Sequence, residues 1–311
     1  METIASAPSK AILFGEHAVV YGHPSVAVPL PEIRAYARVK DIKRRKIIID
    51  MPDFGKTGLF KELAWEHPIR FAVDLFLSGY KITLSNGLRI LIHSDIPIAS
   101  GMVSGAAVST AVFKALFSHF EIKYTSEKLS EFVYEVEKLH HGTPSGIDNT
   151  VVAYERPIVF RKGKEIQHID FSHPIHLVIA NSGSTTPTKV TVGDVRRLYE
   201  NHTDSIKETF TQIERCATLG LEALIQGDLE KAGKNMTENH QLLRALTVSN
   251  ERLDQLVETA TSFGAYGAKL SGGGRGGIVI ALAEAEHVPF LKHILLNAGA
   301  EACFSTKIGS E

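Results

Sequence analysis

Apolar positions in the first third of the chain fall in short runs and alternations that are typical of β-strands. A helical spacing interrupts them once, over residues 67–78, where Ile69, Phe71, Ala72, Leu75 and Phe76 would share one face. Asn86 and Gly87 separate two later runs, and Asn-Gly in that setting predicts a tight hairpin. The predicted strands are residues 11–14, 24–30, 34–39, 46–50, 82–84 and 88–92.

From Pro97 the pattern changes to a loop of small residues followed by helices. Residues 106–120 are rich in Ala, Val, Leu and Phe, which predicts a helix buried on nearly every side. A second, amphipathic helix leads to Glu137. Strands are then expected at 157–160 and 176–180, with a hairpin at Arg161–Lys164 after the first of them.

Helices dominate after about residue 190. One apolar face contains Ile206, Phe210, Ile213, Ala217 and Leu224. Asp228 and Asn250 are expected to cap two further helices, the first through Leu243 and the second ending at Gly264. A glycine-rich loop, residues 271–277, precedes a strand at 278–282, a helix at 288–296 and a last strand near 302–305. The strand-rich first half and helix-rich second half suggest an α+β chain of two closely packed lobes.

Composition narrows the class of protein. The 311 residues include 44% hydrophobic residues, enough for a large core, and the mean hydropathy is +0.00. The 34 basic and 35 acidic residues give a net charge of −1, which argues against nucleic acid or an anionic membrane as a partner. Only Cys216 and Cys303 occur, far apart, which suits a reducing compartment without a zinc site. With no secretory signal and no membrane-length apolar run, we expect a cytoplasmic protein.

The segment Glu137–Asn149 contains the densest chemistry. Glu137 lies four residues after Val133, beside the apolar stripe of its helix. Glycine and proline residues then end the helix, so a turn presents Ser145 and Asp148. Two carboxylates held in this way could be a metal ligand and a base. The alternative is a capped helix end with acids on the surface.

Two loops of small residues, 97–105 and 271–277, have the composition of phosphate-binding loops. Backbone N–H groups of glycine can approach a polyphosphate closely, and a following helix N-terminus adds favourable donors. The alternative for either loop alone is a tight turn. Near the start of the chain, Lys10 could equally be a solvated lysine at a strand end, and Glu16 and His17 could form a turn after Gly15.

Taken together, four segments resemble the GHMP kinase superfamily, and within it the mevalonate kinases. The N-terminal segment Ala7–Gly22 follows their first motif, with Ser9 where glycine is usual, and His141–Asn149 is also typical. The similarity in order and spacing runs from about residue 5 to 282. The four segments are 6–22, 97–108, 137–149 and 269–277.

The resemblance implies a two-lobed α+β GHMP-kinase-like fold, with a strand-rich N-terminal lobe, a helix-rich C-terminal lobe with a β-sheet, and the active site in the cleft between them. The expected domains are residues 1–185 and 186–311. The implied reaction is ATP-dependent phosphorylation of mevalonate to 5-phosphomevalonate, in isoprenoid biosynthesis. ATP and mevalonate are then the expected partners, and neither nucleic acid nor a membrane is expected. A homodimer is compatible with the resemblance.

The resemblance also implies roles for individual residues. Asp148 matches the catalytic base, and Lys10 matches the residue that stabilises this carboxylate and the transferring phosphoryl group. Glu137 and Ser104 match the Mg²⁺ ligands. The substrate-side positions are Glu16, His17, Ser145 and Thr188, and the nucleotide-side positions are Ser100, Gly101, Ser104, Gly105, Ala106, Gly272, Gly273 and Gly274.

The chain departs from the family pattern in both glycine-rich loops. Ala99 and Val103 replace glycines, and Gly105 replaces a serine; Val103 tolerates positive φ poorly. Arg275 replaces a glycine of the third motif, where it would either contact phosphate or crowd the site. Two alternatives follow: a related kinase of phosphomevalonate or homoserine, and a non-catalytic ligand-binding member of the fold. Lys10, Glu137 and Asp148 together favour an active kinase.

Overall fold

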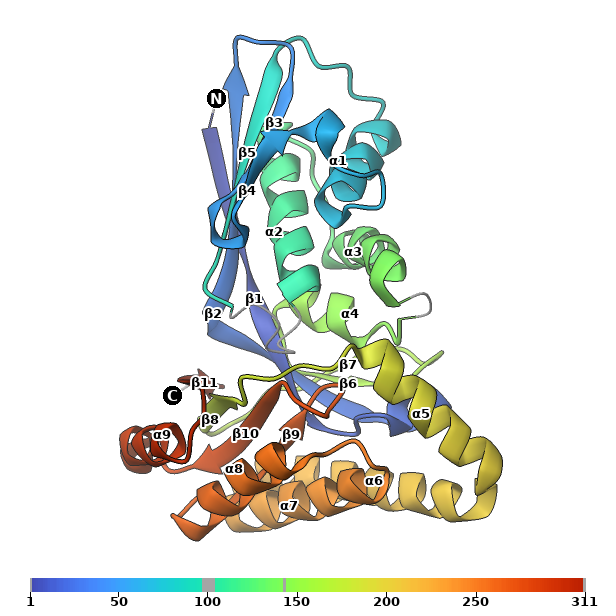
Figure 1. The fold of residues 1–311 in the computed structure, drawn as a ribbon, viewed down its shortest axis with the longest axis vertical. Coiled ribbons are helices and arrows are strands. Elements are labelled where there is room, and N and C mark those ends of the chain that lie inside the picture. Colours follow the sequence, from blue (N-terminus) through green and yellow to red (C-terminus); the bar gives the residue numbers. More distant parts are fainter. Residues whose placement is uncertain (1, 97–103, 142–143, 310–311) are drawn as a thin grey trace. The chain divides into compact units, whose positions relative to one another are not determined.

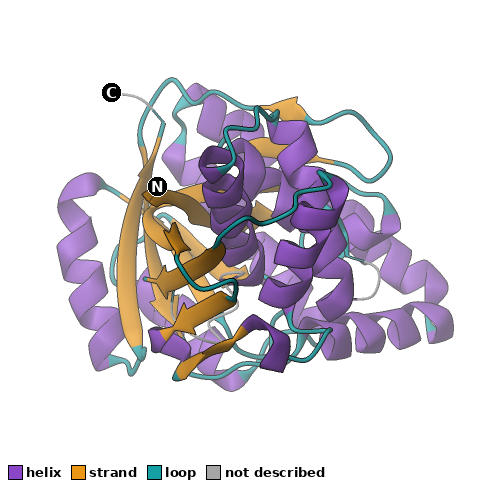
Figure 2. Ribbon diagram, turned by 90° about the horizontal axis from the view of Figure 1, so that it is seen from above, coloured by secondary structure: helices purple, strands orange, loops and turns teal. Residues whose placement is uncertain are grey.

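The computed structural model describes residues 2–96, 104–141 and 144–309. It contains two compact units, each assembled from separate stretches of the chain. Unit 1 contains residues 1–9, 33–97 and 103–155, and unit 2 contains residues 10–32, 98–102 and 156–311. Helices and strands occur in both, so the expected α+β class is confirmed (Figure 2). The domain division at residue 185 stays a prediction.

Unit 1 is built on a sheet with the strand order β4-β3-β5-β2. The strand β5 is central in it, since it pairs antiparallel with β2 and parallel with β3. The long strands β1 and β2, which pair with each other, contribute residues to both units. The bounds are β1 (Glu2–Phe14), β2 (Ser25–Ile42), β3 (Ile47–Met51), β4 (Lys56–Leu59) and β5 (Gly87–Ser94).

Four helices of unit 1 lie together on one side of this sheet (Figure 1). They pack through aromatic rings, such as Phe76 and Phe117, which meet edge to face with centroids 5.0 Å apart. The helix α2 is buried along most of its length, as its composition predicted. The helices are α1 (Pro68–Gly79), α2 (Ser104–His119), α3 (Ser126–His141) and α4 (Ile147–Tyr154), and short 3-10 turns cover Pro52–Phe54 and Phe60–Glu62.

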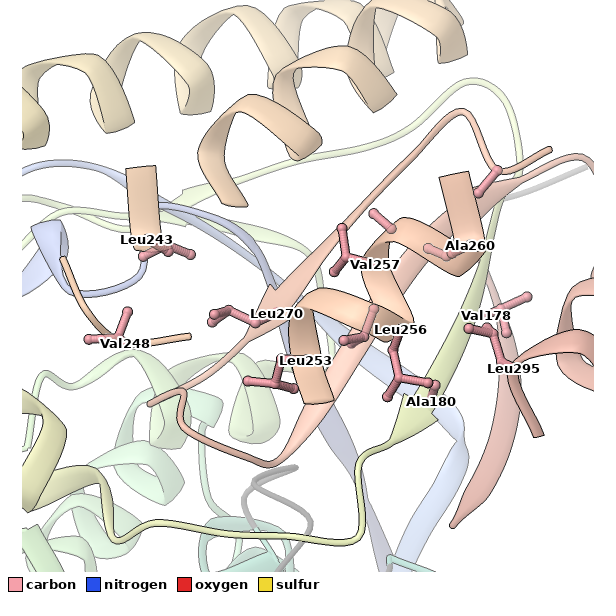
Figure 3. Close-up of a cluster of buried hydrophobic side chains, with 14 of the residues drawn as sticks. Val178, Ala180, Leu243, Val248, Leu253, Leu256, Val257, Ala260, Leu270 and Leu295 are labelled. Carbon is pink, nitrogen blue, oxygen red and sulfur yellow. The ribbon is translucent and has the colours of Figure 1, made fainter. Parts of the chain in front are cut away.

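Unit 2 contains an antiparallel sheet in the order β11-β8-β10-β9. The helices α7 and α8 pack against β9 and β10, and α9 packs against β8 and β11. Apolar side chains from these elements, among them Leu253, Leu256 and Leu270, form its core (Figure 3). The strands are β8 (Ile175–Asn181), β9 (Gly267–Ser271), β10 (Ile278–Ala283) and β11 (Ala302–Ile308).

The remaining elements of unit 2 extend this framework. The helices α5 and α6 continue from β8 and pack against each other and, through α6, against α7. The first residues of β2 pair with β6, which pairs in turn with β7. The bounds are β6 (Ile158–Phe160), β7 (Gln167–His168), α5 (Thr188–Asn201), α6 (Thr203–Gln226), α7 (Leu229–Ala245), α8 (Glu251–Ser262) and α9 (Val288–Asn297), with 3-10 turns at Ala18–Tyr21 and Ala285–His287.

The helix positions and both predicted caps are confirmed. The carboxylate of Asp228 accepts from the N–H of Lys231 at 3.0 Å, and the side chain of Asn250 accepts from the N–H of Leu253 at 2.9 Å. The predicted turn after β6 is present as well, with the N–H of Lys164 donating to the carbonyl of Arg161. No helix within the described residues is both long and apolar enough to span a membrane.

The predicted hairpin at Asn86-Gly87 is wrong. Residues 82–84 form no strand, because the N–H of Ile82 closes the end of α1 by donating to the carbonyl of Leu77. Gly87 instead begins β5, where a Cβ atom would lie 1.9 Å from the carbonyl oxygen of Arg44. The glycine therefore allows two backbones to approach closely, and β5 finds its partners elsewhere in the sheet.

Candidate active site

In unit 1, the carboxylate of Glu137 lies against the start of α2. Glu137 is only 2% exposed, beside the fully buried Val133 and Val136 of the same helix face. A Cβ atom built on Gly105 would lie 3.2 Å from Glu137 Oε1. The alternative of a surface acid at a capped helix end is therefore wrong for Glu137.

The turn before α4 places Asp148 in the first turn of that helix. Gly146 is the N-cap residue with φ +94°, a conformation that favours glycine. The side chain of Asn149 fastens α4 to α3 by donating to Ser130 Oγ at 2.8 Å. Ser145 Oγ accepts from the N–H of Ile147 at 3.4 Å. Asp148 is half-buried, and its carboxylate is favoured at a helix N-terminus because of the helix dipole.

The residues of unit 1 suit a hard cation such as Mg²⁺. Glu137 supplies a buried carboxylate, and Gly105 leaves a space beside Oε1 that a side chain would fill. No group of three His, Cys, Asp or Glu side chains gathers anywhere in the described part of the chain. Mg²⁺ commonly takes one or two protein carboxylates and completes its shell with phosphates and water. Ser104 and Ala106 lie in the same first turn of α2.

Several predicted nucleotide-side residues lie outside the described residues. These are Ser100 and Gly101, together with the variant positions Ala99 and Val103. Their roles stay predictions.

In unit 2, Lys10 is a buried residue on β1. It is 3% exposed, so the alternative of a solvated lysine at a strand end is wrong. Two residues further along, Ile12 is joined to Ser271 at the end of β9: the Ile12 N–H donates to Ser271 Oγ at 2.8 Å, and this hydroxyl donates to the Ile12 carbonyl at 3.1 Å. The strand that carries Lys10 is thus fixed to the glycine-rich loop that follows β9.

The turn Gly15–His17 contacts the same loop. Gly15 has φ +94°, and a Cβ there would lie 2.4 Å from the Pro24 carbonyl oxygen, so only glycine fits. His17 Nε2 donates to the carbonyl of Gly273 at 3.0 Å. Burial lowers the pKa of His17 to about 4, a shift that the Gly273 carbonyl only partly opposes. His17 is therefore a neutral hydrogen-bond donor near pH 7.

Glu16 forms a buried ion pair with Lys269 of β9. The side chains are 1% and 0% exposed, and Lys269 Nζ donates to Glu16 Oε1. Burial raises the pKa of Glu16, against the opposing effects of Lys269 and, less strongly, of Lys10. Lys10, Glu16 and Lys269 consequently form one electrostatically coupled group within unit 2.

The glycine-rich loop also meets the start of α5. A Cβ atom on Gly273 would lie 2.8 Å from Thr188 Oγ1. Gly272 and Gly274 have φ of +100° and +81°, which only glycine adopts readily. The structure thus brings together His17, Gly273 and Thr188, three residues that were predicted separately.

Arg275 holds the loop in place. Its Nε donates to the Thr247 carbonyl at 2.9 Å, and its guanidinium also pairs with Asp194 of α5. Its backbone N–H donates to the Val248 carbonyl at 2.7 Å, and its carbonyl accepts from Thr186 Oγ1 at 2.9 Å. The guanidinium is therefore engaged with the protein on two sides.

Three residues at this site were not assigned from the sequence. They are Lys269, Ser271 and Asn239, whose Oδ1 accepts from the N–H of Gly15 at 3.2 Å. A signal existed only for Lys269, which is a charged residue within the otherwise small and apolar strand Gly267–Ser271. Asn239 and Ser271 are ordinary polar residues in sequence, and only the packing of α7 and β9 against β1 identifies them.

Comparisons with known proteins match both parts of the chain. Residues 66–156 match the family described as "GHMP kinases N terminal domain", and residues 221–301 match "GHMP kinases C terminal". The chain is 33% identical over 303 residues to the mevalonate kinase of Pyrococcus furiosus, covering 91% of this chain and 90% of that protein.

Two solved structures have the same fold. The Methanococcus jannaschii mevalonate kinase superposes with a TM-score of 0.88 at 26% identity, over 100% of this chain and 99% of the other. The L. major mevalonate kinase in complex with R-mevalonate gives 0.86 at 28% identity, over 100% and 96%. By both family regions and by full-length similarity, the chain belongs to the GHMP kinase family.

Proposed function

We propose that the chain transfers the γ-phosphoryl group of ATP to the 5-hydroxyl of mevalonate, giving 5-phosphomevalonate and ADP for isoprenoid biosynthesis. The observation that carries the proposal is the 33% identity to a mevalonate kinase over about nine-tenths of both chains. The buried charges of the site support it, because Lys10, Glu16 and Glu137 are each at most 3% exposed. Burying ionised groups is costly, which favours a functional reason for them.

In this reaction the substrate oxygen attacks the γ-phosphorus as the bond to the ADP oxygen breaks. Asp148, at the N-terminus of α4, takes the hydroxyl proton. Lys10 provides a fixed positive charge for the transferring phosphoryl group. Glu137 and Ser104 would hold Mg²⁺, which would supply positive charge to neutralise the phosphates.

The residues of unit 2 bind and orient the reactants. Glu16, His17 and Thr188 contact the alcohol substrate, and Ser145 of unit 1 contributes from the turn before α4. The N–H groups of Gly272–Gly274 bind nucleotide phosphate, since no side chain covers these backbone donors and the positive φ angles of Gly272 and Gly274 shape the loop around them. In unit 1, Gly105 and Ala106 contribute N–H groups from the start of α2.

Two alternatives are less well supported. A kinase of phosphomevalonate or homoserine would share the fold, but it is to a mevalonate kinase that the chain is 33% identical over about nine-tenths of both chains. A non-catalytic binding protein would have no use for a buried carboxylate facing the start of α2. The cytoplasmic location and a homodimer also remain proposals; both cysteines are free, as a reducing compartment would require.

A coupled assay of ADP release tests the proposed substrate. The purified chain is given ATP, Mg²⁺ and, separately, mevalonate, phosphomevalonate, homoserine or galactose. We expect kcat/KM for mevalonate to exceed that for each other alcohol by about 100-fold or more, since a site built to hydrogen-bond one substrate rejects those that leave its polar groups unpaired. Faster turnover of another alcohol would reassign the substrate, and ATP binding without turnover of any would favour the non-catalytic alternative.

A further inference from the structure

We propose that Lys269 is a positioning residue, which binds one carboxylate oxygen of Glu16 so that the other, Oε2, accepts a hydrogen bond from the alcohol substrate. This inference rests on the proposed function and adds a residue to it. Lys269 touches Glu16 and would act on the substrate only through it.

The first support is the burial of the pair. Lys269 is 0% exposed and Glu16 1%, and Lys269 Nζ also donates to the carbonyl of Leu270 at 2.7 Å. A buried ion pair contributes little net stability compared with an apolar pair of similar volume, while loss of one partner is strongly destabilising. Stability alone therefore gives little reason for an ion pair at this place.

The second support is the asymmetry of the Glu16 carboxylate. Oε1 accepts from Lys269, whereas Oε2 is buried and has no hydrogen-bond partner among the described residues. Two neighbouring donors are engaged elsewhere, because the Gly15 N–H binds Asn239 and His17 Nε2 binds Gly273. A buried acceptor without a partner is costly, and a ligand hydroxyl would satisfy it.

The third support is the rigidity of the frame around Lys269. The residue that follows it, Leu270, donates its N–H to His240 Nδ1 at 3.3 Å, and Ser271 is joined to Ile12 by two hydrogen bonds. These contacts fix β9 both to α7 and to the strand of Lys10. Lys10 also acts electrostatically on both members of the pair. Lys269 thus neutralises Glu16 from a fixed position. The orientation of the Glu16 carboxylate is therefore set by Lys269 and not by Lys10.

Four proteins test the inference: the wild type, Lys269→Met, Glu16→Gln and the double variant. We expect Lys269→Met to lower kcat/KM for mevalonate by about 30-fold or more, mainly through KM, as truncating one partner of a buried charge pair commonly does. Glu16→Gln should lose a similar factor. The double variant should be no worse than Glu16→Gln, because Lys269 acts through Glu16. The KM for ATP should stay within about twofold of wild type in all three.

Lys114→Met is the matched control, because it removes a lysine from a different ion pair, which is partly buried and joins Lys114 to Glu155 at the C-terminal end of α4. Its kinetics should equal those of wild type. Multiplying losses in the double variant, or Lys269→Met with unchanged mevalonate kinetics, would overturn the inference. If Lys269→Met fails to fold, the double variant decides, since it buries no unpaired charge.

Calorimetric titration with mevalonate separates this inference from the proposed function. A wild type that binds mevalonate without turnover would contradict the proposed reaction, and weaker binding by Lys269→Met would still support the positioning role. Equal binding by a folded Lys269→Met would refute the positioning role even if the wild type is a kinase. A wild type that neither binds nor phosphorylates mevalonate would contradict both the proposed reaction and the positioning role of Lys269.

Discussion

Single buried charged and polar residues distinguish this site from the surrounding core. Lys10, Glu16, Glu137 and Lys269 are each nearly inaccessible to solvent. Each would be expensive to bury without a partner, and the shifted pKa of Glu16 reflects that cost. The same physics applies to His240 of α7, directly behind β9. His240 is 1% exposed, donates from Nε2 to Asp254 and accepts the Leu270 N–H at Nδ1.

His240 should make the stability of the protein depend on pH. Burial lowers its pKa to about 4, more strongly than Asp254 raises it, and Lys269 and Arg244 add to the lowering. Above pH 6.5 both folded and unfolded His240 are neutral. Between pH 6.5 and pH 4 the unfolded chain takes up the proton and the folded chain does not, so stability falls as pH falls. The contribution lost over this range is about 3 kcal/mol.

Urea unfolding between pH 7 and pH 4.5 measures this effect. His240→Asn should flatten the decline of the unfolding midpoint toward acid pH, leaving the part due to the similarly shifted His17. The control is His293→Asn, the same replacement at an exposed histidine of α9. Parallel pH profiles for wild type and His240→Asn would show that His240 titrates normally.

At the scale of elements, the glycine-rich loop between β9 and β10 depends on its neighbours for its shape. The sequence left two interpretations of Arg275, a phosphate contact or a steric obstacle. In the structure its guanidinium instead binds Thr247 and Asp194, and it adopts φ +53° where the family has glycine. The pKa of Asp194 is lowered by Arg197 and by Arg275. Arg275 therefore stabilises the loop through contacts of its side chain with Thr247 and Asp194.

Replacing Arg275 should make the loop between β9 and β10 more mobile without unfolding the protein. Arg275→Gly suits the backbone angle and keeps both backbone hydrogen bonds to Val248 and Thr186. We expect the KM for ATP to rise about threefold to tenfold, from the lost charged hydrogen bonds, with a nearly unchanged melting temperature. Arg197→Ala is the control, since Arg197 also pairs with Asp194 but has a side chain that is 74% exposed. Steady-state kinetics at saturating mevalonate measure the KM for ATP of both variants. A lower KM in Arg275→Gly than in wild type would mean that Arg275 crowds the nucleotide.

Periodicity in the sequence predicted the elements that depend on local pattern. The buried α2 followed from its run of apolar residues, and the caps Asp228 and Asn250 followed from a capping residue directly before an apolar helical pattern. The prediction of a hairpin at Asn86-Gly87 was wrong because Gly87 lies against the backbone of residues 44–46, which are distant in sequence. Lys269 was missed as a functional residue for the same reason, since its partner Glu16 lies 253 positions away.

At the scale of the whole molecule, each of the two units contains some of the predicted site residues. Unit 1 contains Glu137, Asp148 and the start of α2, and unit 2 contains Lys10, Glu16 and the loop after β9. Neither unit is continuous in sequence, because each combines stretches from different parts of the chain. The resemblance to a family supplied what local pattern could not, namely a prediction of which polar residues take part in the reaction.

The central claim, that the chain phosphorylates mevalonate with Asp148 as the base, is tested most directly by the initial rate of 5-phosphomevalonate formation, followed by phosphorus NMR in wild type and Asp148→Asn. The wild type should form this product in step with ADP. Asp148→Asn should be slower by about 1,000-fold or more, with little change in affinity for an ATP analogue. No 5-phosphomevalonate from the wild type, or a variant rate within a few-fold of it, would contradict the account.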